Sequence, residues 1–219
     1  LHDMALERAD GRAVDLARHG EPLRALAMAI WFGLAESDRL NALLVSTGLA
    51  FREIAILRAL GETPDVVIAL GRAVCRGLRA GGVMPIVKHI PGHGRATADS
   101  HEDLPVVTAP LEELEATDFV PFKSLANLPM GMTAHILYTA LDAERVATLS
   151  PIVIDYIRQK IGFEGLLMSD DVSMKALKGD MDSLTHGILN AGCDLVLHCN
   201  GKMDEMQAIA SAVRPLEGR

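Results

Sequence analysis

The sequence has few cysteines and no long apolar run. Its three cysteines, Cys75, Cys193 and Cys199, cannot all pair, and two of them lie in apolar contexts, so we expect free thiols in a reducing cytoplasm. The longest apolar-rich stretch, residues 25–34, is too short to cross a bilayer. The N-terminal residues also lack the basic and apolar regions of a secretory signal peptide. We therefore expect a soluble, cytoplasmic protein.

An excess of positive charge is absent as well. The 219 residues include 21 Lys and Arg against 29 Asp and Glu, which gives a formal net charge of -8 and a pI near 5.4. This balance argues against nucleic acid and against an anionic membrane as main partners. The length suits one domain with a sizeable hydrophobic core.

The most informative stretch is residues 88–101, which combine three histidines, a lysine, an arginine and an aspartate. It directly follows an apolar run, residues 82–87, that is typical of a buried strand. A proline and two glycines within the stretch interrupt regular structure, so we expect the strand to end at Lys88 and His89. Such groups at the carboxyl end of a buried strand are where α/β proteins place their chemistry.

One interpretation of this stretch is a metal site. His89 and His93 are four residues apart, and Asp99 and His101 follow closely. However, a zinc-binding pair at this spacing needs a helix, and the Pro-Gly pair between the two histidines excludes one. Only a site built on a loop remains for a metal.

The other two interpretations are an anion-binding loop and acid/base catalysis. Gly92 and Gly94 expose backbone N–H groups, and Lys88 and Arg95 supply positive charge, but the Gly-Lys-Ser/Thr ending of a P-loop is absent. In the Asp-Ser-His triplet at residues 99–101, the carboxylate can fix the tautomer of the histidine and stabilise its imidazolium form. By itself this triplet is a weak signal.

From residue 57 onward, apolar strand-like segments alternate with helical ones. We expect strands at residues 83–89, 130–135, 165–170 and 194–198. We expect helices at residues 64–80, 151–161, 184–191 and 204–213, and one from residue 110 that is divided near Asp118 and Pro121. This alternation implies a parallel sheet covered by helices, either a (β/α)8 barrel or an open sheet.

Residues 1–56 differ from the rest of the chain. They are rich in Ala, Leu and Arg, and we expect helices at residues 12–18, 22–34 and 38–44. The alternation of strands and helices that follows residue 57 is not seen in this segment. We therefore predict a divergent, mainly helical N-terminal segment at 1–56 and a separate barrel portion at 57–219.

Several motifs, in this order, resemble those of glycoside hydrolase family 3. The Lys-His-Ile-Pro-Gly-His-Gly run from Lys88 and the Asp-Ser-His triplet are similar to the signature of its bacterial β-N-acetylglucosaminidases, which trim sugars from recycled peptidoglycan fragments. The resemblance continues through residues 132–135, 148–151, 161–174 and 191–194. It implies a (β/α)8 TIM-barrel type of fold whose C-terminal half is clear and whose N-terminal part is atypical or incomplete. The family's acidic, glycine-rich upstream motif has no counterpart here.

The resemblance implies retaining hydrolysis of terminal β-linked N-acetylglucosamine. Asp170, in the run Ser-Asp-Asp-Val-Ser-Met, matches the family's nucleophile, which forms a covalent glycosyl-enzyme. His101 matches the acid/base, and Asp99 matches the carboxylate that orients it. No metal or organic cofactor is expected, since acid, nucleophile and substrate suffice.

The resemblance also implies three substrate-binding residues. Lys88 and His89 match residues that hydrogen-bond the sugar hydroxyls. Arg58 resembles the family's sugar-binding arginine, although Leu60 stands where the family usually has an aromatic residue, and a solvated arginine is the alternative. The expected partner is a small carbohydrate of the GlcNAc-anhydro-muropeptide type.

Each expected strand ends in a polar residue. These residues are Lys88 with His89, His135, Asp170 and His198. The carboxyl ends of parallel strands meet at one edge, where barrel enzymes hold their active site. For His135 and His198, structural hydrogen bonds are expected rather than catalysis. For Asp170, the alternative is a cap of the following helix.

Two other functions stay open at this point. The unmatched residues 1–56 favour a truncated, catalytically inactive homologue of family 3. Another family 3 β-glycosidase, such as a β-glucosidase, is the second possibility, and the Asp-Ser-His triplet counts against it.

Overall fold

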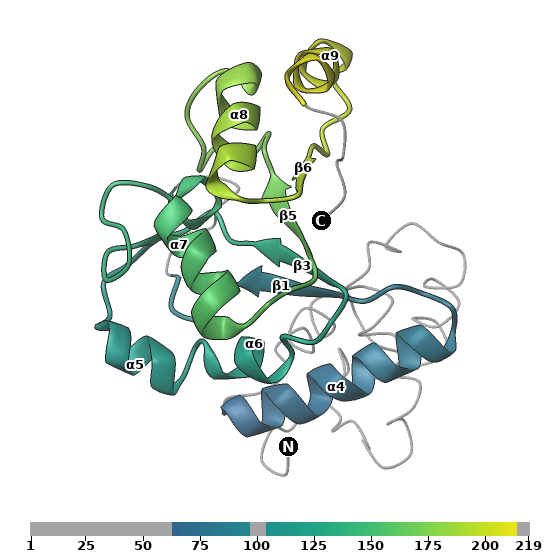
Figure 1. Cartoon of the computed structure of the whole chain (residues 1–219), viewed down its shortest axis with the longest axis vertical. Helices are drawn as coiled ribbons and strands as arrows, with labels where there is room; N and C mark the ends of the chain where they lie inside the picture. The colour runs from purple at the N-terminus through teal and green to yellow at the C-terminus, as the bar shows by residue number, and fades with distance from the viewer. Residues whose placement is uncertain (1–62, 97–103, 214–219) are drawn as a thin grey trace, which may run out of the picture. The chain divides into compact units, whose positions relative to one another are not determined.

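The computed structural model describes residues 63–96 and 104–213 (Figure 1). The chain divides into two compact units, Leu1–Val74 and Cys75–Arg219. All that follows, helix α4 excepted, concerns the second unit. The helices predicted within residues 1–56 lie outside the described residues, so the proposed division of the chain remains a prediction.

Helix α4 (Pro64–Ala80) crosses the boundary between the two units. It begins at the proline expected in its first position, and Asp65 lies in its first turn, where a negative charge complements the helix dipole. Gly81 and Gly82 follow its last residue, and Gly82 has a φ of 76°, which favours glycine. The predicted bounds of this helix are confirmed.

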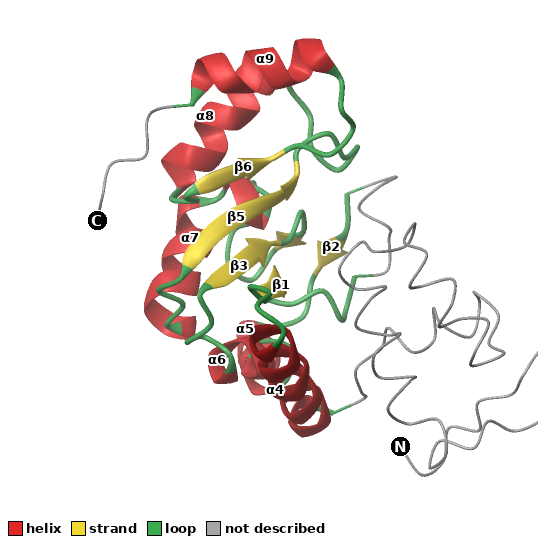
Figure 2. Cartoon of the chain, turned by 90° about the vertical axis from the view of Figure 1, so that its right-hand side faces the viewer, coloured by secondary structure: helices red, strands yellow, loops and turns green. Residues whose placement is uncertain are grey.

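Four parallel strands form the central sheet, in the order β1-β3-β5-β6 (Figure 2). The strands are β1 (Ile86–Ile90), β3 (Met130–Thr133), β5 (Leu166–Asp171) and β6 (Leu195–Leu197). Their pairing aligns Ile86 with Met130, Met130 with Leu166, and Met168 with Leu195. The four expected strands are therefore present and parallel, with ends that differ by a few residues.

A second, two-stranded sheet was not expected. Its strands β2 (Val106–Val107) and β4 (Leu137–Tyr138) pair in parallel. Two residues are too few to show a periodic pattern, so the sequence gives no signal for such strands. Strand β2 lies just beyond the stretch that carries Asp99 and His101.

Helices follow the strands as the alternation predicts. They are α5 (Leu111–Ala116), α6 (Val120–Ser124), the short η1 (Ala147–Leu149), α7 (Pro151–Tyr156), the π-helical turn η2 (Ile157–Ile161), α8 (Met181–Ala191) and α9 (Met203–Ala212). The gap between α5 and α6 confirms the predicted break near Asp118. Ser150 caps α7 by accepting a hydrogen bond from the backbone N–H of Val153 (3.2 Å), and Gly162 ends η2 with a φ of 80°.

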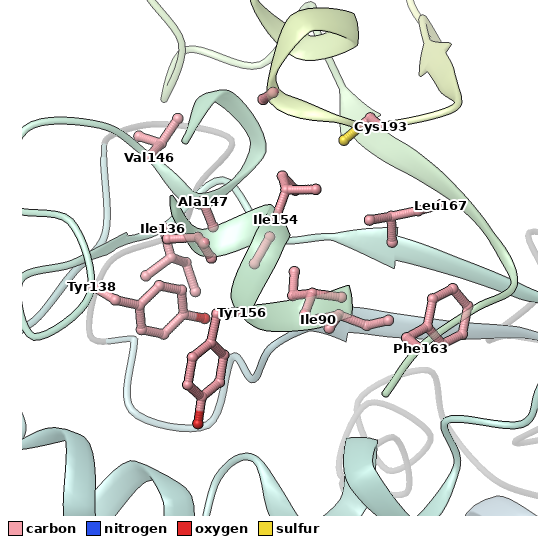
Figure 3. Packing of buried hydrophobic residues seen from close by; sticks show 14 of the residues in the cluster. Ile90, Ile136, Tyr138, Val146, Ala147, Ile154, Tyr156, Phe163, Leu167 and Cys193 are labelled. Atoms are coloured by element: carbon pink, nitrogen blue, oxygen red, sulfur yellow. The ribbon is translucent and has the colours of Figure 1, made fainter. Parts of the chain in front are cut away.

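The hydrophobic core lies between the sheet and helices α7 and α8. Leu167 of β5, Ile154 of α7 and Ile188 of α8 are buried in one cluster, part of which is drawn in Figure 3. Gly131 of β3 allows this packing because a Cβ there would lie 2.7 Å from Cδ1 of Ile90. Each large apolar side chain buried in this way stabilises the fold by about 1.5–3 kcal/mol.

Arg158 holds the amino-terminal ends of β5 and β6 together. Its Nη1 donates to the carbonyl oxygens of Phe163 (3.0 Å) and Gly165 (2.7 Å), and its Nη2 donates to Oδ2 of Asp194 (2.8 Å). Asp194 Oδ2 also accepts the backbone N–H of Leu167 at 2.8 Å.

A parallel sheet with intervening helices confirms the α/β class. The described residues form the four-stranded sheet and the β2–β4 pair, so closure into an eight-stranded barrel is not shown by them. Within the same described part of the chain, no helix is both long and apolar enough to span a membrane.

Candidate active site

Polar residues meet at the carboxyl-terminal edge of the four-stranded sheet, which we call the carboxyl edge. They are Lys88 and His89 in β1, His135 after β3, Asp170 in β5 and His198 directly after β6. Because the four strands are parallel, their carboxyl ends lie on the same side of the sheet. The predicted shared edge is confirmed.

Asp170 directs one carboxylate oxygen towards His89. Its Oδ2 lies 3.4 Å from Nε2 of His89, while its Oδ1 accepts the backbone N–H of Asp171 at 2.9 Å. The Asp170 side chain is 15% exposed, so it is largely but not completely shielded from water. A partly shielded carboxylate with an oxygen facing a neutral donor has the character of a nucleophile or an electrostatic stabiliser.

The neighbouring Asp171 has a different environment. Its Oδ1 accepts the backbone N–H groups of Ser173 and Cys199, each at 3.0 Å, and the Ser173 hydroxyl lies within 2.8 Å of both carboxylate oxygens. These bonds tie the residues after β5 to those after β6. Asp171 is therefore an anchor within the fold, and the geometry separates its role from that of Asp170.

The helix-cap alternative for Asp170 is wrong. The next helix, α8, begins at Met181, eleven residues after Asp170, and its cap is Asp180, which accepts the backbone N–H of Ser183 at 2.8 Å. Asp170 itself belongs to strand β5.

His89 is held in its neutral form. Burial lowers its pKa from 6.5 to about 4, and the nearby positive charge of Lys88 acts in the same direction, against the opposing effect of Asp170. At neutral pH, Asp170 therefore faces an imidazole and not an imidazolium. A neutral imidazole offers one N–H donor and one acceptor, which suits hydrogen bonding to a polyol.

His135 has a structural role, as expected. It is 1% exposed, its Nδ1 lies 2.8 Å from Oγ1 of Thr148, and its Nε2 lies 3.0 Å from the carbonyl oxygen of Asp171. The Thr148 hydroxyl in turn lies 2.8 Å from that of Thr133 and 3.1 Å from the carbonyl oxygen of Ala134. This buried network positions the end of β5, where the two aspartates lie.

His198 is also engaged by a carboxylate. Its Nε2 lies 2.8 Å from Oε2 of Glu205, and hydrogen bonds from His198, Asn200 and Lys202 lower the pKa of Glu205 to about 2. The His198 side chain is 6% exposed, and its Nδ1 has no hydrogen-bond partner within the described part of the chain. The bond to Glu205 agrees with the structural role expected for His198.

The structure brings together three of the six predicted site residues, Lys88, His89 and Asp170. Asp99, His101 and Arg58 lie outside the described residues, so their placement and the roles of all six residues remain predictions.

The anion-binding interpretation of the stretch after β1 finds no support in the described residues, and the metal interpretation includes Asp99 and His101, which lie outside them. Within residues 63–96 and 104–213, no group of three or more His, Cys, Asp or Glu side chains could hold a metal ion. The guanidinium of Arg95, one of the two charges in the anion-binding interpretation, instead pairs with Asp118 and Glu113 at 2.6 and 2.9 Å.

Sequence reasoning missed two features near this edge. The anchoring role of Asp171 was missed because the sequence of an Asp-Asp pair does not show which carboxylate accepts hydrogen bonds from backbone N–H groups. The pairing of Arg95 with Asp118 joins residues 23 positions apart, and no local pattern signals it.

Curated relatives similar to this chain are named beta-hexosaminidase. The protein from Methylococcus capsulatus is 41% identical over 167 residues, which cover 74% of this chain and 48% of the relative. The protein from Chromobacterium violaceum is 39% identical over 162 residues, which cover 72% of this chain and 45% of the relative. The chain thus spans about half the length of the curated relatives it matches.

Solved structures show the same similarity. A glycoside hydrolase family 3 beta-N-acetylglucosaminidase from Paenibacillus sp. superposes with a TM-score of 0.67 at 33% identity, over 71% of this chain and 31% of that one. NagZ from Neisseria gonorrhoeae, solved in complex with zinc ion, superposes with a TM-score of 0.66 at 25% identity, over 93% of this chain and 61% of that one. The family model described as the glycosyl hydrolase family 3 N terminal domain matches residues 52–218. The chain belongs to glycosyl hydrolase family 3.

Proposed function

We propose that this protein is a retaining β-N-acetylhexosaminidase that removes terminal N-acetylglucosamine, with Asp170 as its nucleophile. The observation that carries the proposal is the difference between the two aspartates at the end of β5. The carboxylate of Asp171 accepts hydrogen bonds from the backbone of the fold, whereas Asp170 directs an oxygen towards neutral His89. Family membership and the beta-hexosaminidase relatives support this activity over other carboxylate chemistry.

In the first step, an oxygen of Asp170 attacks the anomeric carbon of the sugar. The bond between that carbon and the leaving oxygen breaks, and the imidazolium of His101 gives its proton to the leaving oxygen. The product is an ester between the sugar and Asp170. Asp99 orients the imidazole of His101 and favours its charged form.

In the second step, water releases the sugar. The now neutral His101 accepts a proton from water, the water oxygen attacks the anomeric carbon, and the bond to Asp170 breaks. Asp170 regains its carboxylate and His101 its proton, so the enzyme is restored. No group other than substrate, water and these side chains enters the balance.

Three residues bind the sugar in this proposal: Lys88, His89 and Arg58. Neutral His89 can donate to or accept from a hydroxyl without adding a second positive charge beside Asp170. Lys88 lies one residue away in β1 and supplies a charged donor. In this proposal β1 thus contributes one cation, Lys88, and one neutral donor, His89, to the sugar site.

The substrate that we propose is a peptidoglycan fragment of the GlcNAc-anhydro-muropeptide type. The support is the resemblance of the Asp-Ser-His triplet at residues 99–101 to that of the bacterial β-N-acetylglucosaminidases. We place the protein in the cytoplasm because Cys75, Cys193 and Cys199 are all free thiols, as expected in a reducing compartment.

The test is hydrolysis of a chromogenic β-N-acetylglucosaminide by the purified chain and its Asp170→Asn variant. Asparagine has nearly the same shape as aspartate but is a far weaker nucleophile, so we expect the rate to fall by at least about 10³-fold. Asp182→Asn is the matched control, because Asp182 lies on α8 with a 65% exposed side chain, and its rate should equal that of wild type.

Each other outcome counts against the proposal in a distinct way. An unchanged rate in Asp170→Asn would exclude Asp170 as the nucleophile. A folded wild-type chain without turnover would support the inactive-homologue alternative. Faster hydrolysis of the matched β-glucoside than of the β-N-acetylglucosaminide would support another family 3 specificity.

A further inference from the structure

The backbone N–H of Asp171 holds one oxygen of the proposed nucleophile. It donates to Oδ1 of Asp170 at 2.9 Å, while Oδ2 of Asp170 lies 3.4 Å from Nε2 of His89. Together these two contacts engage both oxygens of the carboxylate. The orientation of the Asp170 carboxylate therefore depends on where the N–H of Asp171 is held.

The carbonyl group of Asp171 is held from the side of strand β3. Nε2 of His135 lies 3.0 Å from its oxygen, and because a carbonyl oxygen can only accept, this ring nitrogen carries the proton. The same oxygen accepts the backbone N–H of Met174 at 3.2 Å. His135 is itself buried and lies 2.8 Å from the buried hydroxyl of Thr148, so this support is shielded from water.

The carboxylate of Asp171 is held from the side of strand β6. Its Oδ1 accepts the backbone N–H of Cys199 at 3.0 Å, directly beyond the position where Asp171 pairs with Leu197. The next residue, Val172, donates its backbone N–H to the carbonyl oxygen of Leu197 at 2.9 Å. On the side of β5 itself, Ser173 donates its backbone N–H to Oδ1 at 3.0 Å, and its hydroxyl lies within 2.8 Å of both carboxylate oxygens.

We infer that Asp171 is a positioning residue for the nucleophile Asp170, which it orients through its own backbone N–H. The inference rests on the proposed function. Asp171 is fixed through its carbonyl oxygen and its carboxylate at the ends of three neighbouring strands, β3, β5 and β6. Attack on the anomeric carbon needs the reacting atoms about 3–3.5 Å apart and aligned, and a misplacement of about 1 Å can cost about 100-fold in rate.

The test measures two quantities for wild type and Asp171→Ala. The first is kcat/KM for a chromogenic β-N-acetylglucosaminide, which reports the formation of the bond to Asp170. The second is the inhibition constant of N-acetylglucosamine, the product, which reports sugar binding alone. We expect Asp171→Ala to lower kcat/KM by about 100-fold and to change the inhibition constant by less than about 3-fold.

Asp171→Asn separates hydrogen bonding from charge. The amide keeps an oxygen that accepts the backbone N–H groups of Ser173 and Cys199, and its NH2 group can donate to the Ser173 hydroxyl, but it carries no charge. We therefore expect its kcat/KM to stay within about 5-fold of wild type. A loss as large as that in Asp171→Ala would show that charge matters and not position, and it would overturn the inference.

Asp142→Ala is the matched control. Like Asp171, Asp142 accepts two backbone N–H groups, from Glu144 at 2.9 Å and Arg145 at 3.1 Å, and a serine hydroxyl, that of Ser150 at 2.6 Å. Its loss removes an anchor from a different segment, so kcat/KM and the inhibition constant should equal those of wild type. An equal loss of kcat/KM in both alanine variants would show a general effect of lost anchors. That result, or an unchanged kcat/KM in Asp171→Ala, would overturn the inference.

Ser173→Ala carries the test if Asp171→Ala does not fold. It removes only the hydroxyl that is bonded to the Asp171 carboxylate and keeps the backbone N–H. We expect kcat/KM to fall by about 10-fold at an unchanged inhibition constant. An unchanged kcat/KM, or an inhibition constant that rises as much as kcat/KM falls, would overturn the inference.

Crystal structures of wild type and of the alanine variant at Asp171 or Ser173 separate this inference from the proposed function. We expect Oδ2 of Asp170 to lie 3.4 Å from Nε2 of His89 in wild type and to shift by about 1 Å or more in the variant. If the wild-type chain shows no hydrolysis, the proposed function fails while this comparison still tests the positioning. The same carboxylate orientation in both proteins would overturn the inference whatever the activity.

Discussion

Two adjacent carboxylates at the end of β5 differ because their hydrogen bonds differ. Among the described residues, Asp171 accepts two backbone N–H groups, from Ser173 and Cys199, whereas Asp170 accepts one, from Asp171, and directs Oδ2 to His89. Hydrogen bonds to a carboxylate spread its charge and weaken it as a nucleophile. The residue with fewer of them is the better candidate for attack on the sugar.

His89 gives the stability of the protein a specific pH dependence. Its pKa is lowered to about 4 in the folded state, against 6.5 for the free side chain, mainly because of burial. Between these two pH values the unfolded chain binds more protons than the folded one, so unfolding becomes easier as pH falls. The contribution of neutral His89 is complete above about pH 6.5 and is lost on the way to pH 4.

His89→Gln removes this titration. Its free energy of unfolding, measured in urea at pH 7 and at pH 4.5, should fall less between the two conditions than that of wild type. His186→Gln is the control, because His186 is 50% exposed on α8, and this variant should behave as wild type. Equal losses in wild type and His89→Gln would show that His89 is not held neutral by the fold.

At the scale of elements, short polar contacts decide where helices begin. The buried Oγ of Ser150 accepts from the backbone N–H of Val153 at 3.2 Å and donates to Oδ2 of Asp142 at 2.6 Å. Ser150→Ala removes both bonds at the start of α7, so we expect the free energy of unfolding to fall by about 1–3 kcal/mol.

Urea denaturation measures this change. The control is Ser211→Ala, because Ser211 is exposed on α9 and its hydroxyl donates to the carbonyl oxygen of Gln207 in the same helix; this change should alter the free energy of unfolding by less than about 0.5 kcal/mol. Similar small effects in both variants would mean that the cap of α7 contributes little.

The elements that the sequence predicted are those with strong local signals. Strand β5 and helix α7 were predicted because apolar runs, a Ser-Pro start and a terminal glycine mark them. Strands β2 and β4 were missed because each has two residues and forms only by pairing with residues 31 positions away in the chain. The start of α8 was placed three residues late, since its cap, Asp180, lies in a polar stretch without apolar periodicity.

At the scale of the whole molecule, the four-stranded sheet of the described residues agrees with the family's structures. The chain spans about half the length of its curated relatives, 48% and 45% of the two described above. The parallel order β1-β3-β5-β6 agrees with the predicted α/β class and with the family's structures. Of the predicted site, Lys88, His89 and Asp170 came together because strand ends are readable from sequence, whereas Arg58, Asp99 and His101 lie outside the described residues.

The measurement that tests the central claim most directly is the trapping of the covalent intermediate. A 5-fluoro N-acetylglucosaminyl donor forms the glycosyl-enzyme but slows its hydrolysis, so peptide mass spectrometry can locate the sugar. We predict one sugar per chain, attached to Asp170. A label on Asp171 or on any other residue, or none on a chain that hydrolyses its substrate, would contradict Asp170 as the nucleophile.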